Sequence, residues 1–268
     1  MSNFKLLVMD VDDTLTHDAR VISQANLDAV ARAQQAGLFV TIATGRGFKA
    51  SELAWKPMGI QGPVINYGGA LINDTRTNAC IYASEFPSRL VHALLEYAAE
   101  LGIYAHLCDG DIIIHESEHP FADIYARELG IPQVIDPDIR NKDWVNIPKA
   151  LYYVEPERID EYLPMVAKRF EGAFKVSGSK PGFIEINMLG ADKGAAVARV
   201  AQSLGIEKQQ VAAIGDNTFD IEMLQWAGYS AAVGNAQQPV KEIVNIVVPS
   251  CAENGVAWFI DNVVLKGG

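Results

Sequence analysis

The amino-acid sequence predicts an α/β fold, a doubly wound parallel sheet covered by helices, into which a second α+β domain is inserted. Three observations predict this fold. Strand and helix patterns alternate over about the first 80 residues, short strands with a hairpin signal follow, and the alternation returns from Asp192. Alternation is typical of a parallel sheet, whereas hairpins join antiparallel strands. We therefore expect a core made of residues 1–82 and 188–268, with an inserted domain at residues 83–187.

The first part of the core is predicted from short apolar runs separated by helix signals. Ser23 can cap a helix whose Leu27, Val30 and Ala31 share one face, and Gly37 ends that helix. A further helical segment lies between Gly47 and Pro57. The expected strands of the parallel sheet are Lys5–Met9, Leu38–Ala43 and Pro63–Asn66.

The inserted domain and the second part of the core have different patterns. An amphipathic helix ends near Leu101, and two short strands then meet at Asp109–Gly110, which is a hairpin signal. We expect a mixed, mainly antiparallel sheet with helices on one face. The further elements expected there are helices Phe121–Leu129 and Arg158–Arg169 and strands Leu151–Val154, Phe174–Ser177 and Phe183–Ile186. The core elements that follow are helix Asp192–Leu204, strand Val211–Ile214, helix Ile221–Ala227, strand Ser230–Val233 and a last helix through Trp258.

Composition limits the possible partners. Apolar residues make up 49% of the 268 residues and charged residues 21%, a balance typical of globular proteins. The net charge of -11 and the lack of a basic run argue against nucleic acid. No export signal and no apolar run long enough to span a membrane are present, and the three widely spaced cysteines fit no disulfide framework. We expect a cytoplasmic protein that contacts no membrane.

Polar side chains gather where the expected strands end, and this is where ligands bind in an open parallel sheet. Two aspartates follow the first strand, a threonine follows the second, and a lysine opens the helix after the insertion. Two more aspartates follow the next strand. These residues are Asp10, Asp12, Thr44, Lys193, Asp216 and Asp220.

The residue types suit phosphoryl transfer. A carboxylate can attack phosphorus and form an acyl phosphate, and Asp10 is our expected nucleophile. Asp12 can protonate the leaving oxygen and later deprotonate the attacking water. Thr44 can donate a hydrogen bond to a phosphoryl oxygen, and Lys193 can neutralise charge on the transferred group.

Crowded carboxylates need a cation, and Mg²⁺ prefers hard oxygen ligands. Asp10, Asp216 and the backbone carbonyl of Asp12 can supply these ligands. Asp220 lies one helical turn after Asp216 and can orient Lys193 or a water bound to the metal.

Taken together, these motifs resemble the haloacid dehalogenase superfamily, and specifically its Cof-type branch, whose large cap is inserted between the second and third motifs. The resemblance covers essentially the whole chain. The segments that carry it are Asp10-Val11-Asp12-Asp13-Thr14-Leu15, Ala43-Thr44-Gly45-Arg46, Lys193-Gly194 and Gly215-Asp216-Asn217-Thr218-Phe219-Asp220, with Val233-Gly234-Asn235-Ala236 after them.

The resemblance implies a Mg²⁺-dependent phosphatase with a Rossmann-like core and a cap that selects the substrate. The implied substrate is a small organic phosphate, such as a sugar phosphate, a nucleotide or a phosphorylated cofactor. Its binding residues would be Thr44, Gly45, Arg46, Lys193 and Asn217. The oligomeric state is left open between a monomer and a small homo-oligomer.

Three positions depart from the usual pattern of the branch. Asp13 stands where it has Gly, Gly68 where it has Asn, and Phe219 where it has Asn. Two side-chain amides are therefore missing near the expected site. Asn66 and Asn217 are candidates to supply such groups.

Other readings of the sequence are weaker. Gly45–Ala50 matches a dinucleotide fingerprint, but such a fingerprint follows the first strand of its fold, and here that strand ends in Asp10 and Asp12, which would repel pyrophosphate. Gly190–Gly194 lacks the ending of a P-loop. A phosphomutase or phosphotransferase could use the same aspartyl phosphate, and a catalytically silent protein could bind a phosphorylated metabolite on the same fold.

Overall fold

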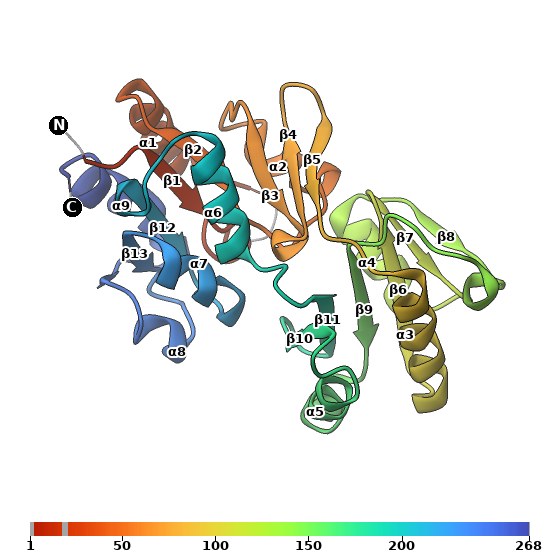
Figure 1. The fold of residues 1–268 in the computed structure, drawn as a ribbon. Coiled ribbons are helices and arrows are strands. Elements are labelled where there is room, and N and C mark those ends of the chain that lie inside the picture. The colour runs from red at the N-terminus through yellow and green to blue at the C-terminus, as the bar shows by residue number, and fades with distance from the viewer. Residues whose placement is uncertain (1–2, 18–20, 268) are drawn as a thin grey trace. The chain divides into compact units, whose positions relative to one another are not determined.

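The structure is a computed structural model that describes residues 3–17 and 21–267. The ends of the expected core segments at residues 1 and 268 lie outside this range. The chain divides into two compact units (Figure 1). The core unit comprises residues 3–17, 21–45, 51–81 and 192–267, and the cap unit comprises residues 46–50 and 82–191.

The core unit is built on a five-stranded parallel sheet with the strand order β14-β13-β12-β1-β2. Strand β1 lies between β12 and β2 and is buried along its whole length. Strands covered on both faces form continuous apolar runs, which is why the sequence pattern predicted β1, β2, β12 and β13, whereas the short and partly exposed β14 was not predicted. Their bounds are β1 Leu6–Met9, β2 Phe39–Ile42, β12 Val211–Gly215, β13 Tyr229–Ala232 and β14 Ile246–Val247.

Helices cover the sheet in two groups, so the core is doubly wound as predicted. Helix α1 packs against α9, and α6 packs against α7, as Figure 1 shows. Ser23 caps α1 by accepting a hydrogen bond from the Asn26 N–H at 3.2 Å. The helix bounds are α1 Gln24–Gln35, α2 Glu52–Trp55, α6 Lys193–Ser203, α7 Ile221–Trp226, α8 Gln238–Lys241 and α9 Gly255–Phe259.

The buried face of α1 is displaced by about one residue from the apolar face expected from the sequence. Val30 is buried, but Leu27 and Ala31 are only partly buried. Asn26 takes a central place instead, because its side chain donates to the Leu15 carbonyl and accepts from the Ala257 N–H. A purely apolar pattern cannot predict a buried asparagine that joins two other segments.

The expected third strand of the parallel sheet is also corrected. Pro63–Asn66 (β3) forms a separate three-stranded sheet, ordered β3-β4-β5, with β4 (Leu71–Asp74) and β5 (Ala79–Ala83). A bridge between Ala43 and Ile65 joins it in parallel to the segment after β2. The chain reverses after β3 through Tyr67, Gly68 and Gly69, which all have positive φ, and pairs β4 antiparallel with β3.

The cap unit contains a six-stranded sheet with the order β10-β11-β9-β6-β7-β8. Every pairing is antiparallel except that between β7 and β8, which is parallel. The mixed sheet is therefore confirmed. The strands are β6 Tyr104–Asp109, β7 Ile112–His115, β8 Gln133–Ile135, β9 Lys149–Tyr153, β10 Phe174–Gly178 and β11 Phe183–Met188, and the helices are α3 Ser88–Leu101, α4 Pro120–Leu129 and α5 Ile159–Arg169.

The helices of the cap unit do not all lie on one face of its sheet, contrary to expectation. Helices α3 and α5 pack on the face that includes Leu107, Tyr152 and Ile184. Helix α4 packs on the opposite face, where the Phe121 ring stacks on that of Tyr153 with centroids 3.9 Å apart. Side chains alternate between the faces of a strand, and aromatic rings cover this second face of the sheet.

His106 lies in this aromatic layer and is fully buried. Burial, with smaller contributions from Lys149 and His115, holds the pKa of His106 well below its usual value. The folded state therefore binds fewer protons than the unfolded chain just below the ordinary histidine pKa, so His106 makes stability fall as pH drops through this window.

We expect His106→Phe to flatten this dependence. Over the pH range 7.5 to 5.5, the variant should lose less free energy of unfolding than the wild type, by at most about 1.4 kcal/mol per pH unit. Urea unfolding at several pH values measures the difference. His92, which is only partly buried, provides the control variant His92→Phe, and equal pH slopes for wild type and His106→Phe would contradict the prediction.

Candidate active site

The first two aspartates of the site are brought together by strand pairing. Asp10 follows β1 and Asp216 follows β12, and the parallel register aligns Met9 with Ile214. The Asp10 N–H donates to the Ile214 carbonyl at 3.0 Å, which continues the ladder into the site. Both carboxylates therefore emerge at the carboxyl edge of the sheet, where ligands bind in this class of fold.

Lys193 lies between two carboxylates. Its Nζ is 2.5 Å from Asp10 Oδ1 and 2.6 Å from Asp220 Oδ1, and all three side chains are buried. Lys193 is the first residue of α6, and Asp192 caps that helix by accepting a hydrogen bond from the Ala195 N–H at 2.8 Å. The helix start fixes the direction in which the ammonium group points.

The second oxygen of Asp220 organises the loop after β12. Asp220 Oδ2 accepts hydrogen bonds from the backbone N–H groups of Asp216 at 2.9 Å and Asn217 at 3.2 Å. Both Asp220 oxygens are thus occupied, one by Lys193 and one by the backbone. This arrangement supports the predicted role of Asp220 in orienting Lys193, which we carry forward as part of the proposal.

Gly215 allows Asp220 to approach this closely. A Cβ at Gly215 would lie 2.5 Å from Asp220 Oδ2. We expect Gly215→Ala to displace Asp220, to lower the turnover of the site by about 100-fold and to cost about 1–3 kcal/mol of stability. Steady-state kinetics and urea unfolding check this. Gly178→Ala is the control, because a Cβ there meets nothing closer than Leu163 Cδ2 at 3.4 Å.

Thr14 is a site residue to which the sequence analysis gave no role. Its Oγ1 donates to Asp216 Oδ1 at 2.8 Å, and the side chain is fully buried. The two residues are far apart in sequence, so only the folded structure reveals the bond. The available signal was the position of Thr14 inside the first motif, four residues after Asp10.

Asp10, Asp216 and Asp220 form an acidic cluster, in which one carboxylate oxygen from each lies within 4.8 Å of the others. Burial raises the pKa of Asp10 well above its usual value; Lys193 opposes this, while Asp220 and Asp216 add to it. Burial and Asp220 raise the pKa of Asp216 to about 7. Burial alone would lower the pKa of Lys193, but Asp10 and Asp220 outweigh it and raise that pKa.

The charges of the acidic cluster favour a further cation. Lys193 provides one positive charge for three buried carboxylates, and Asp10 Oδ2 is buried with no hydrogen-bond donor among the described residues. Oxygen-only donors at this spacing suit a hard divalent cation such as Mg²⁺. The residues present therefore fit the metal that the sequence analysis expected.

The other residues that the sequence predicted for the site lie outside the acidic cluster. Thr44 is buried, and its backbone joins Ile65 and Gly68 through hydrogen bonds of 3.0 and 2.9 Å. Asp12 is partly buried in the turn after β1. Gly45 ends the core segment, and Arg46 is assigned to the cap unit, where it is buried.

Two of the three departures from the family pattern occur where the backbone is left-handed. Asp13 has φ 59° and Gly68 has φ 64°, a region that Gly, Asn and Asp tolerate best. The exchanged residues therefore preserve the turns. The Asn235 side chain also holds the first turn, since it donates to the Asp13 carbonyl at 2.8 Å.

The two candidate replacement amides differ in use. Asn66 donates to Ser51 Oγ at 3.0 Å and accepts from Asn73 at 2.9 Å, so it joins segments of the core unit. Asn217 accepts from the Phe219 N–H at 2.9 Å, and its Nδ2 is 3.5 Å from Asp216 Oδ1. Asn217 is therefore the better candidate for a role at the site.

Comparison with known proteins shows the family to which the chain belongs. Residues 7–260 match the family described as haloacid dehalogenase-like hydrolase, and the chain belongs to this family, in its Cof-type branch. It is therefore a hydrolase enzyme of the phosphatase kind. This identification also removes the dinucleotide-binding reading of Gly45–Ala50.

Relatives of known sequence or structure cover nearly the whole chain. The putative phosphatase YxeH of Bacillus subtilis is 30% identical over 98% of this chain and 99% of its own. The 5-amino-6-(5-phospho-D-ribitylamino)uracil phosphatase YitU of the same organism is 26% identical over 95% and 96%. A crystal structure of a haloacid dehalogenase-like hydrolase from Bacteroides thetaiotaomicron superposes with a TM-score of 0.87 at 26% identity, covering 97% of this chain and 99% of that one.

Within residues 3–17 and 21–267, no helix is both long and apolar enough to cross a bilayer.

Proposed function

We propose that the protein is a Mg²⁺-dependent phosphatase that hydrolyses a small organic phosphate monoester through an aspartyl phosphate on Asp10. The observation that carries the proposal is the buried group of Asp10, Lys193 and the two further aspartates at the end of the parallel sheet. The name of YitU, a phosphatase of a phosphorylated ribityl compound, supports the substrate class. Sugar phosphates, nucleotides and phosphorylated cofactors are the substrates to test.

In the first step, an oxygen of the Asp10 carboxylate bonds to phosphorus and the ester P–O bond breaks. Asp12 gives its proton to the leaving oxygen, which departs as an alcohol. In the second step, Asp12 takes a proton from water, the water oxygen bonds to phosphorus, and the bond between phosphorus and Asp10 breaks. Inorganic phosphate is released, and both aspartates return to their starting states.

The surrounding residues stabilise the charge on the transferred group. Lys193 and the Thr44 hydroxyl would offer positive charge and a hydrogen bond to phosphoryl oxygens. When bound, Mg²⁺ supplies charge neutralisation and polarises the phosphoryl group. Asp10, Asp216 and the Asp12 carbonyl would hold the metal, with Asp220 keeping Lys193 and the Asp216 loop in place.

A panel of phosphate esters, assayed with Mg²⁺ and with a chelator, tests this function. We expect inorganic phosphate to appear in proportion to substrate loss, and only with the metal. Transfer of phosphate to a hydroxyl of another molecule would favour the phosphotransferase reading. No turnover of any ester would favour the silent binding protein.

Metal binding has its own readout, which does not depend on finding the substrate. Mg²⁺ should raise the thermal midpoint of the wild-type protein, because a ligand that binds only the folded state stabilises it. Asp216→Asn should reduce this rise.

The cytoplasmic location stays part of the proposal. It is supported by the three cysteines, which all lie within the described residues and none of which forms a disulfide.

A further inference from the structure

The cap unit carries a pocket of about 240 Å³ that plays no part in the proposed chemistry. It lies between the end of α3, the start of β6, residues 116–119 and residues 139–140. Its volume is well above the roughly 10–15 Å³ needed to hold one water, yet below the roughly 300–1,000 Å³ of pockets for drug-sized ligands. The pocket therefore suits a small metabolite.

One part of the pocket lining is apolar. Leu95 and Ala98 come from α3, Ile103 from the segment before β6, and Ile139 from the short helix that follows β8. Leu95, Ala98 and Ile139 are buried members of the hydrophobic core of the cap unit. These side chains provide a fixed surface against which an aliphatic group of a ligand can pack.

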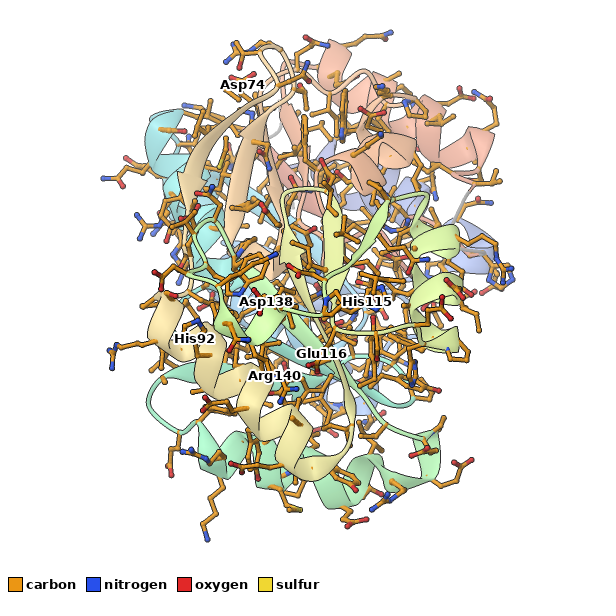
Figure 2. The ribbon with its side chains drawn as sticks, turned by 90° about the vertical axis from the view of Figure 1, so that its right-hand side faces the viewer. Asp74, His92, His115, Glu116, Asp138 and Arg140 are labelled. Carbon is orange, nitrogen blue, oxygen red and sulfur yellow. The ribbon has the colours of Figure 1, made fainter. Side chains whose placement is uncertain are left out.

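The other part of the lining carries one pair of opposite charges. Arg140 contacts Glu116 through Nε at 2.9 Å and Nη2 at 2.5 Å, and both bonds go to the same oxygen, Oε1. Glu116 Oε2 and Arg140 Nη1 are left without a hydrogen-bond partner among the described residues. The two side chains are 40% and 45% exposed, and Figure 2 shows them close together beside α3.

His119 and Ser117 add polar groups to the same lining. His119 Nδ1 accepts the Phe121 N–H at 3.2 Å, so the neutral ring carries its proton on Nε2, which can donate to a ligand. Burial, and more weakly His115, lower the pKa of His119, which keeps the ring neutral near pH 7. The Ser117 hydroxyl makes no hydrogen bond within the described part of the chain and can also donate.

We infer that this cap pocket binds a small zwitterion with an aliphatic side chain, that is, an aliphatic α-amino acid. The ammonium group would pair with Glu116, the carboxylate with Arg140, and the side chain would lie against Leu95, Ala98 and Ile139. This binding site goes beyond the proposed phosphatase function and does not depend on it.

Charge balance selects this ligand class over simpler ones. Glu116 and Arg140 neutralise each other, so a ligand with a single charge can pair with one only by competing with the other. A zwitterion satisfies both. An exposed ion pair contributes little to stability, so separating Glu116 from Arg140 around a ligand carries a small penalty.

The test is an NMR titration of the full-length ¹⁵N-labelled protein with L-leucine. We expect saturable shifts in the backbone signals of residues 116–119 and 139–140. Two truncated probes, 4-methylpentanoate without the ammonium group and 3-methylbutylamine without the carboxylate, should each bind at least 10-fold more weakly. Arg140→Gln and Glu116→Gln should each weaken L-leucine binding by a similar factor.

Arg158→Gln is the matched control. Arg158 forms an exposed pair with Glu161 on α5, away from the pocket lining, so this variant should bind L-leucine like the wild type. The inference is overturned if L-leucine causes no saturable shifts, if the shifts fall outside the pocket, or if either truncated probe binds as well as L-leucine. Unchanged affinity in both Arg140→Gln and Glu116→Gln also overturns it.

Discussion

Asp10→Asn should reduce phosphate release by about 10⁴-fold or more, because an amide cannot form the acyl phosphate on which both steps depend. The change is close to isosteric. In the wild type Lys193 Nζ lies 2.5 Å from Asp10 Oδ1, and the asparagine keeps a hydrogen-bond acceptor at that place. It also removes one of three crowded carboxylates. The folded state should therefore survive, and the loss should appear in kcat rather than in expression or solubility.

The control for this variant is Asp28→Asn in the same unit, where the exposed carboxylate accepts a hydrogen bond from Gln24. It should retain wild-type turnover. Thermal unfolding of both variants checks the fold. If Asp10→Asn kept a tenth or more of the wild-type rate, Asp10 could not be the nucleophile, and the mechanism would need another acceptor for the phosphoryl group.

Most of the core could be predicted from sequence because buried parallel strands and amphipathic helices have local patterns. The errors arose where distant groups decide the outcome. Pro63–Asn66 has the composition of a core strand, yet the left-handed turn at Gly68 directs the following segment back onto it. The second face of the cap sheet was missed because rings from α4, such as Phe121, cover it through contacts between segments distant in sequence.

Sequence motifs predicted the residues of the candidate site, but they could not predict how these residues are placed relative to one another. Strand register places Asp10 beside Asp216, and the start of α6 directs Lys193 between Asp10 and Asp220. The bond from Thr14 to Asp216 and the close approach of Asp220 to Gly215 depend on the same packing. The cap pocket had no sequence signal at all, since its charged pair joins two segments that follow different strands.

Lys193→Met should be the most destabilising of the proposed substitutions. The ammonium group is buried between Asp10 and Asp220, and removing one partner of a buried ion pair typically costs about 3–5 kcal/mol because the remaining charges stay buried without compensation. Turnover should also fall severely. The matched control is Lys56→Met, since Lys56 forms an exposed pair with Glu52 and should contribute little.

The pH dependence separates a lost charge from a simple packing defect. Burial and mutual repulsion already raise the pKa values of Asp10 and Asp216, so the folded state retains protons that the unfolded chain has released, and stability falls as pH rises toward neutrality. Without Lys193 this repulsion is stronger. Urea unfolding of metal-free protein should therefore show a larger deficit for Lys193→Met at pH 7.5 than at pH 5.5, and Asp220→Asn in the same background should recover part of it. A deficit independent of pH would contradict this prediction, because it would mean that the loss of stability does not come from the missing charge of Lys193.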